Sequence, residues 1–232
     1  MLLVQLLSLL VSDPIQFIFV VLLLIVPLML SVTFHEWAHG IVAYNLGDPT
    51  PKLSGRLTLN PFAHIDPVGT LMLLLVGIGW AKPVPVNTLN IPEKYKLMLV
   101  AIAGPLSNFL LAILFSILLV IVHIFAKDNP NSFFVMLEMP LNIIIKINLI
   151  LAVFNLIPIP PLDGSRVIYW LLPDGLSQKY NFLEPYGIFI VFILLFTVGF
   201  KFIVNIAEYI QTKLILFIAH IVYNYLQLVS QI

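Results

Sequence analysis

The chain has 232 residues, of which 61% are hydrophobic and only 9% are charged. Soluble domains carry about 25% charged residues, so this composition excludes a water-soluble globule and indicates an integral protein of the lipid bilayer. Basic and acidic residues are equal in number, at 11 each, and without a basic cluster nucleic acid is not expected as a partner. Because the chain has no cysteine, disulfides and thiolate metal sites are also excluded.

Residues 1–12 are apolar but too short to span a bilayer, and they predict a short helix in the membrane interface. Asp13 and Pro14 are typical of a helix start. The helical pattern continues from there to Leu46, where Gly47 provides a C-terminal stop. At 1.5 Å per residue such a helix is about 50 Å long. We therefore expect it to tilt, to kink or to project from the membrane.

A polar, turn-rich stretch over residues 48–66 follows this helix. Within it, residues 52–60 alternate apolar and polar side chains, which is typical of a half-buried strand. Residues 84–87 also have an extended pattern, so the two pieces predict a small β element at the cytoplasmic face, with an edge that could accept substrate by strand addition. The alternative is an ordinary surface hairpin that only closes the loop. Between them, residues 67–81 are apolar but too short to cross the membrane, and they predict a re-entrant segment.

The rest of the chain contains four further apolar stretches that predict spans. They cover residues 97–126 with a local break at Gly104-Pro105, residues 132–162, residues 185–204, and residues 214–232 as a span or an interfacial helix. The predicted fold class is an all-α polytopic membrane protein with about five transmembrane helices, a re-entrant segment and a small β element. We expect a single membrane-embedded domain over residues 1–232, with a core over 14–182 and C-terminal helices over 185–232.

Basic residues are distributed unevenly between the predicted loops. Those on one side are Lys52, Arg56, Lys82, Lys94, Lys96, Arg166 and Lys179, whereas the opposite loop offers Lys127. Basic residues near the ends of spans favour the cytoplasmic side. The sequence therefore predicts a multi-pass protein of the cell membrane whose functional site opens toward the cytoplasm.

An H-E-x-x-H motif, His35-Glu36-Trp37-Ala38-His39, lies within the first predicted helix. Histidines four residues apart share one helix face, which suits two adjacent positions of a tetrahedral zinc ion. Glu36 lies beside them, where it could take a proton from metal-bound water. The alternative is a hydrogen-bonded polar cluster in a helix bundle, but ionisable groups at membrane depth are costly and are usually functional. The motif predicts one zinc ion per chain.

A hydrolytic zinc site needs a third protein ligand and an open position for water. Asp163 ends a predicted span on the same side as the motif, and Gly164 would let the backbone bend there, so depth favours Asp163. His64 and Asp66, on a nearby loop, are second choices, and His64 could instead support a ligand, relay a proton or act as a cap beside Asp66. The remaining candidates, in less favourable positions, are His123, Glu208 and His220.

Asn155 lies eight residues before Asp163, about two helical turns, so we expect both on roughly the same helix face. Its amide could donate to a developing oxyanion. The alternative role is a hydrogen bond between helices. In the same predicted span, Lys146 is expected to neutralise a carboxylate, with Glu138 as its partner, or to snorkel to the interface.

Two motifs far apart in the chain occur together. They are His35-Glu-x-x-His39-Gly40 and Asn155-x-x-Pro158-x-Pro-x-Leu162-Asp163-Gly164. The chain thereby resembles the site-2 protease family of intramembrane zinc metalloproteases, over about residues 34–166. Asn60-Pro-Phe-Ala-His64-Ile-Asp66-Pro67 and Gly77-x-Gly79-Trp-Ala-Lys-Pro-Val-Pro-Val86 are similar to its compact bacterial and archaeal members. Unlike many members, the sequence shows no PDZ-like or CBS-like domain. The resemblance implies zinc held by His35, His39 and Asp163, Glu36 as the base, and Asn155 assisting at the scissile carbonyl.

These observations predict an intramembrane zinc metalloprotease that hydrolyses peptide bonds within or beside transmembrane segments of membrane-protein substrates. Two alternatives from other classes are a divalent-metal transporter and a catalytically inactive membrane scaffold. Transport needs polar sites along a path, whereas this chain concentrates its expected ligands at one depth, with only His123 continuing toward the other side. An inactive scaffold has no need of Glu36. A Glu36→Gln variant would separate protease from transporter, because proteolysis would stop while transport continued.

Overall fold

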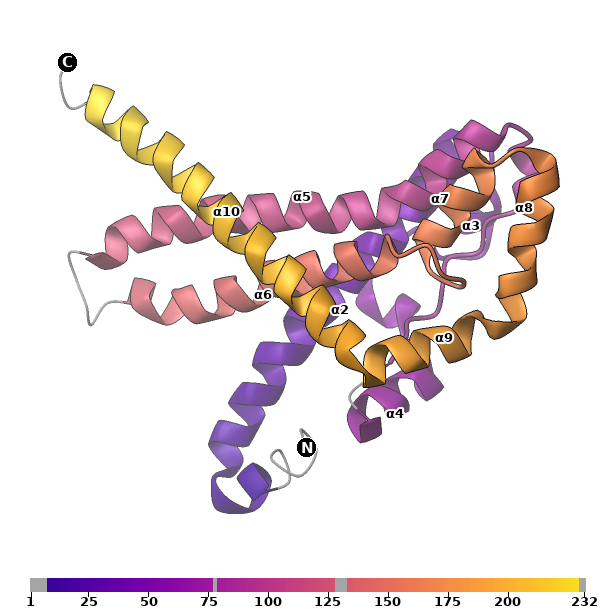
Figure 1. Cartoon of the computed structure of the whole chain (residues 1–232). Coiled ribbons are helices and arrows are strands. Elements are labelled where there is room, and N and C mark those ends of the chain that lie inside the picture. Colours follow the sequence, from indigo (N-terminus) through magenta and orange to yellow (C-terminus); the bar gives the residue numbers. More distant parts are fainter. Residues whose placement is uncertain (1–7, 77–78, 128–132, 230–232) are drawn as a thin grey trace. The chain divides into compact units, whose positions relative to one another are not determined.

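The computed structural model describes residues 8–76, 79–127 and 133–229, and its regular elements are helices (Figure 1). In chain order they are α2 (Pro14–Asn45), α3 (Thr50–Leu53), η1 (Pro61–His64), α4 (Pro67–Val76), η2 (Thr88–Asn90), α5 (Lys94–Lys127), α6 (Phe133–Asn155), α7 (Asp163–Leu171), α8 (Asp174–Tyr180), η3 (Asn181–Leu183), α9 (Glu184–Phe196) and α10 (Val198–Val229). Of the predicted interfacial helix, residues 8–12 are helical, and residues 1–7 lie outside the described part.

Five helical stretches in the described part are long and apolar enough to cross a membrane. They are Pro14–Asn45, Lys94–Lys127, Phe133–Asn155, Gly175–Phe196 and Gly199–Tyr225. The predicted all-α class is confirmed, and the number of helices able to cross a membrane agrees with the predicted number of spans.

The chain divides into two compact units at a point inside α5, the first covering Met1–Gly104 and the second Pro105–Ile232. α5 is continuous through Gly104 and Pro105, so the predicted local break is wrong. A proline inside a helix removes one backbone hydrogen bond. Membrane helices tolerate this loss because neighbouring groups and small local adjustments satisfy the freed carbonyl.

In the first unit, α2 forms as the sequence predicts, and its two ends show why. The Asp13 carboxylate accepts a hydrogen bond from the Gln16 N–H at 3.0 Å, and Pro14 lies in the first turn, where its missing N–H is not needed. Beyond the last turn, Gly47 has a φ of 107°, a conformation that is strained for residues with a Cβ. Both ends of the helix are therefore determined locally.

Residues 52–60 do not form the predicted strand. The Asp48 carboxylate accepts the Thr50 N–H at 3.1 Å, and a helical turn, α3, begins there instead. Gly55 then turns the chain with a φ of 69°, so the alternating side chains on either side of it do not belong to one extended segment. Residues 84–87 have no partner strand, and no strand is formed by the described residues. The predicted β element is wrong, and so is its proposed edge for substrate.

α4 is only ten residues long, and the chain returns to its first turn soon after it ends. A Cβ on Gly69 would lie 2.1 Å from the Trp80 carbonyl oxygen, so glycine permits the close approach. The Lys82 N–H also donates to the His64 carbonyl oxygen at 2.9 Å. Entry of this segment into the membrane stays a prediction.

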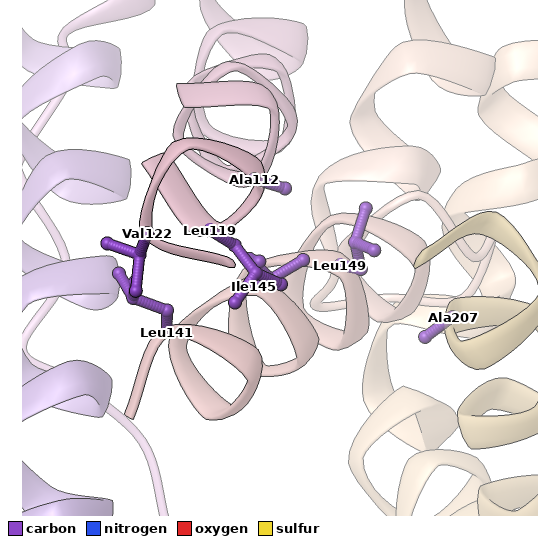
Figure 2. Packing of buried hydrophobic residues seen from close by; sticks show 7 residues of the cluster. All are labelled: Ala112, Leu119, Val122, Leu141, Ile145, Leu149 and Ala207. Carbon is purple, nitrogen blue, oxygen red and sulfur yellow. The ribbon is translucent and has the colours of Figure 1, made fainter. Parts of the chain in front are cut away.

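In the second unit, α5, α6 and α10 share an apolar core (Figure 2). Its buried members are Ala112, Leu119, Val122, Leu141, Ile145, Leu149 and Ala207. α10 crosses α6 (Figure 1), and the small side chain of Ala207 permits their close approach. Lipid tails are as apolar as these side chains, so van der Waals packing rather than escape from water stabilises the contact.

Polar pairs accompany this core. Lys146 Nζ lies 2.9 Å from Glu208 Oε1, which joins α6 to α10. Glu138 was the predicted partner of Lys146, but its Oε1 lies 2.8 Å from Nδ1 of His123 on α5. The predicted pairing is wrong because α10 begins earlier than expected and brings Glu208 within reach of Lys146.

The predicted spans over 185–204 and 214–232 have the wrong boundaries. α9 ends at Phe196, Thr197 is extended with φ −112° and ψ −164°, and α10 begins directly after it. A Cβ on Gly199 would lie 2.7 Å from the Leu194 carbonyl oxygen, so glycine permits the close approach of the chain on either side of the break. The apolar sequence continues through this break and conceals it. Residues 230–232 lie outside the described part.

Candidate metal centre

α2 brings two imidazole rings together in its C-terminal half. The Nε2 atoms of His35 and His39 lie 3.1 Å apart, and the rings meet edge to face with centroids 4.7 Å apart. Two ligands about 2.0–2.1 Å from a tetrahedral zinc ion would lie about 3.3 Å from each other. The side chains are buried, at 7% and 9% exposure. The pair therefore fits two adjacent positions around one zinc ion.

The orientation of His39 is set by a backbone carbonyl on another helix. Its Nδ1 atom lies 2.7 Å from the carbonyl oxygen of Val100, on α5. A carbonyl oxygen only accepts hydrogen bonds, so Nδ1 carries the proton and Nε2 is the nitrogen that can ligate a metal. The same contact fixes the plane of the ring.

Gly104, one helical turn after Val100, makes room for the histidine pair. A Cβ at this position would lie 2.2 Å from His39 Nε2 and 2.7 Å from His35 Cε1. A side chain would thus occupy the space on which the two rings converge. Glycine is required here for close approach rather than for an unusual backbone angle.

The Glu36 carboxylate is also held in place. The Val84 N–H donates to Glu36 Oε2 at 2.8 Å, and the Val84 side chain is buried. Gly40 gives this segment access to α2, because a Cβ there would lie 3.2 Å from Val84 Cγ1. A carboxylate next to metal ligands and restricted in orientation is suited to act as a general base.

In the second unit, Asp163 is the first residue of α7 and is buried. The preceding residues 156–162 are not helical, because Pro158 and the two prolines after it end α6 at Asn155. The expected common helix face of Asn155 and Asp163 is therefore wrong. Asn155 Nδ2 donates to the Leu151 carbonyl oxygen of its own helix at 3.0 Å, and a primary amide has a second N–H.

Close contacts hold the loop that precedes Asp163. The Tyr180 hydroxyl donates to the Pro158 carbonyl oxygen at 2.7 Å. A Cβ on Gly187 would lie 2.0 Å from the Pro160 carbonyl oxygen, and one on Gly164 would lie 2.2 Å from the Leu156 carbonyl oxygen. The predicted reason for Gly164 is wrong: its φ is not positive, and it permits close packing on the loop rather than a bend.

The other candidate ligands make hydrogen bonds within their own units. His64 Nε2 lies 2.9 Å from the Thr58 carbonyl oxygen, and Asp66 Oδ1 accepts the Gly69 N–H at 2.7 Å in the first turn of α4. The remaining three pair as His123 with Glu138, Glu208 with Lys146 and His220 with Asn224. These contacts give each side chain a structural use.

Comparison with known proteins decides the family. The chain is 47% identical over 175 residues to "Putative zinc metalloprotease YwhC" of Bacillus subtilis, an alignment that covers 75% of this chain and 79% of that protein. The family model described as "Peptidase family M50" matches residues 121–198. The chain belongs to peptidase family M50. It is a zinc metalloprotease, and the resemblance to site-2 proteases noted in the sequence is confirmed.

Two further relatives have related names. "Putative zinc metalloprotease Rip2" of Mycolicibacterium smegmatis is 28% identical over 190 residues, which are 79% of this chain and 70% of that protein. "Zinc metalloprotease MJ0392" of Methanocaldococcus jannaschii is 29% identical over 161 residues, which are 69% of this chain and 36% of that protein. No solved structure matches the chain.

The M50 model and the H-E-x-x-H motif lie in different parts of the chain. The matched residues 121–198 include Asn155 and Asp163 but not residues 35–39. Val84, Val100 and Gly104 contact the motif and are missed by motif reasoning, because their contacts join residues far apart in the sequence. The adjacent glycine and proline at 104–105 marked this position in the sequence. They suggested a helix break, whereas the glycine serves the close approach of α5 to the histidine rings.

Proposed function

We propose that this M50 protease hydrolyses peptide bonds within or beside transmembrane segments of membrane proteins. The observation that carries the proposal is the pair of Nε2 atoms of His35 and His39, 3.1 Å apart, beside a carboxylate held by a backbone N–H. Residues 15–34, which precede the pair on the same helix, contain no charge. Catalytic groups on an apolar, membrane-length helix suit a substrate that is itself in the membrane.

The proposed zinc ligands are His35, His39 and Asp163. Two histidines and one carboxylate form an established ligand set of hydrolytic zinc sites. Asp163 is supported by its burial and by its place in the motif that resembles site-2 proteases. The local hydrogen bonds of His64 and Asp66 also favour Asp163 over these two side chains.

Zinc, when bound, polarises a carbonyl group and lowers the pKa of a water molecule. Glu36 accepts a proton from the attacking water and returns it to the leaving amine. The Val84 N–H keeps the Glu36 carboxylate in one orientation for both transfers. The Asn155 amide donates a hydrogen bond to the oxygen of the scissile carbonyl as negative charge develops there.

We place the protein in the cell membrane with the site opening toward the cytoplasm. The excess of basic residues on the loops that follow α2 and α6 supports this orientation. Membrane proteins with a transmembrane helix are the proposed substrates. Residues 67–81 are proposed to dip into the membrane and leave on the same side, because α4 is too short to cross.

Glu36→Gln tests the proposal. The glutamine carbonyl can still accept the Val84 N–H, but it cannot take a proton. Wild type, Glu36→Gln and the control Glu184→Gln, which removes an exposed carboxylate at the start of α9, are co-expressed with a panel of single-span membrane proteins. We expect fragments with wild type and with Glu184→Gln, and none with Glu36→Gln, while all three bind zinc equally.

Identical fragments from wild type and Glu36→Gln would contradict the proposal. Uptake of metal ions into vesicles distinguishes a protease from a metal transporter. A transporter would still carry metal after the Glu36→Gln change, because transport does not need a general base.

A further inference from the structure

Asp48, just beyond the end of α2, is a fully buried carboxylate that binds a distant segment. Its own N–H donates to the Ala43 carbonyl oxygen at 3.0 Å, which fixes it to the last turn of α2. Its Oδ2 accepts the Asn87 N–H at 2.7 Å, and its Oδ1 accepts from Asn90 Nδ2 at 2.7 Å. Hydrogen bonds to an ionised carboxylate are stronger than those between neutral groups. Residues 87–90 are therefore firmly held against α2.

The same segment reaches the general base. Val84 lies three residues before Asn87, and its N–H donates to Glu36 Oε2 at 2.8 Å. Residues 81–87 belong to no helix or strand, so no regular backbone pairing fixes their position. Three residues span at most about 10 Å, and a displacement of Asn87 is transmitted to Val84. The segment is thus attached at two points, to Glu36 on α2 and to Asp48 just beyond the end of that helix.

We propose that Asp48 is a positioning residue of the protease, which acts through the Asn87–Val84 segment to orient the Glu36 carboxylate. The inference rests on the proposed role of Glu36 as the base. Asp48 lies outside the H-E-x-x-H motif and acts only through other residues. One contact holds each end of residues 84–87: Glu36 holds Val84, and Asp48 holds Asn87. Loss of the Asp48 contact frees Asn87 and lets the Val84 N–H move away from Glu36.

Asp48 also has a purely local contact, which provides a control. Its Oδ1 accepts the Thr50 N–H at 3.1 Å and the Thr50 hydroxyl at 2.5 Å, and these bonds stabilise α3. Burial raises the pKa of Asp48, but the hydrogen bonds from Thr50, Asn90 and Asn87 together hold it below the ordinary value of 3.8. Thr50→Val removes only the local hydroxyl bond, whereas Asn90→Ala removes only a bond from the distant segment.

Hydrogen exchange of the Val84 amide tests the attachment without a substrate. Zinc-loaded full-length wild type, Asp48→Asn, Asn90→Ala and Thr50→Val are compared in vesicles of phosphatidylethanolamine and phosphatidylglycerol. We expect the Val84 amide to exchange roughly tenfold faster in Asp48→Asn and Asn90→Ala, and at about the wild-type rate in Thr50→Val. If Asp48→Asn fails to fold, the measurement is made on Asn90→Ala. Asn90 is exposed, so its replacement is expected to leave folding intact. Wild-type protection of Val84 in Asn90→Ala overturns the proposal.

Kinetics then separates positioning from general stability. The substrate is a fluorescently tagged single-span protein that wild type cleaves and Glu36→Gln does not. We expect Asp48→Asn and Asn90→Ala to lower kcat by roughly 10- to 100-fold with KM unchanged, as for lost support of a site residue, and Thr50→Val to change neither. Equal kcat values in Asn90→Ala and Thr50→Val overturn the positioning role of Asp48 but leave the role of Glu36 as the base intact. Cleavage by Glu36→Gln overturns the proposed base instead, so the two failures are distinguishable.

Discussion

Replacement of Gly104 by alanine adds one methyl group against the histidine pair of α2. The added Cβ would lie 2.2 Å from His39 Nε2, whereas non-bonded heavy atoms prefer about 3.5 Å, so the ring would have to withdraw by about 1.3 Å. Its Nδ1 is held 2.7 Å from the Val100 carbonyl oxygen. Val100 lies on the same helix as residue 104, so the ring cannot retreat from the methyl group without straining this hydrogen bond.

Metal–ligand distances in valid sites lie within about 0.2 Å of their standard values, so a shift of about 1.3 Å moves the ring out of ligand range. Loss of the contacts that orient a ligand lowers metal affinity by roughly 10- to 100-fold, and we expect Gly104→Ala to raise the Kd for zinc by at least this factor. The assay is competition with a chromogenic zinc chelator on purified protein. Gly175→Ala is the matched control, because Gly175 also lies in a helix and its Cβ would meet no atom within 4 Å. Wild-type zinc affinity in Gly104→Ala would refute the assigned geometry.

Three further predictions concern other parts of the chain. Asp163→Ala should lower the zinc content measured by atomic absorption and His64→Ala should not, and an unchanged content in Asp163→Ala would exclude it as a ligand. Gly187→Ala places a Cβ 2.0 Å from the Pro160 carbonyl oxygen, so thermal unfolding should show a loss of about 1–3 kcal/mol, and an unchanged Tm would contradict the packing. The lowered pKa of Asp48 contributes stability above about pH 3.8 that is lost as the pH falls through the lowered value; acid titration of the unfolding free energy should show this loss in wild type and not in Asp48→Asn.

The helical spans could be predicted because their signals are local. A cap at Asp13, a proline in the first turn and a glycine after the last turn mark the ends of α2. Length and hydropathy identify the other long helices. The break at Thr197 could not be predicted, because apolar residues on both sides hide a single extended residue. The strand predicted over residues 52–60 was wrong for a related reason. Over a few residues, alternation of apolar and polar side chains does not distinguish a strand from a helical turn followed by a left-handed glycine.

The site likewise contains residues that could be predicted from local sequence and contacts that could not. His35, Glu36 and His39 are adjacent on one helix, so their spacing alone predicts a shared face. The contacts of Val100, Gly104 and Val84 with these residues join positions about 50–70 residues apart in the sequence, and the periodicity rules concern only neighbouring residues along a helix or strand.

The attachment of α10 bears on how the protein can be shortened or fused to other proteins. The family match ends at residue 198, where α10 begins, which suggests a convenient point of truncation. However, Gln211 Nε2 donates to Asn142 Oδ1 at 3.2 Å, and Glu208 pairs with Lys146. Hydrocarbon offers no water to replace a lost polar partner. A chain cut at this point would leave an ammonium group and an amide of α6 facing lipid, so reporter proteins should be joined after α10 rather than in its place.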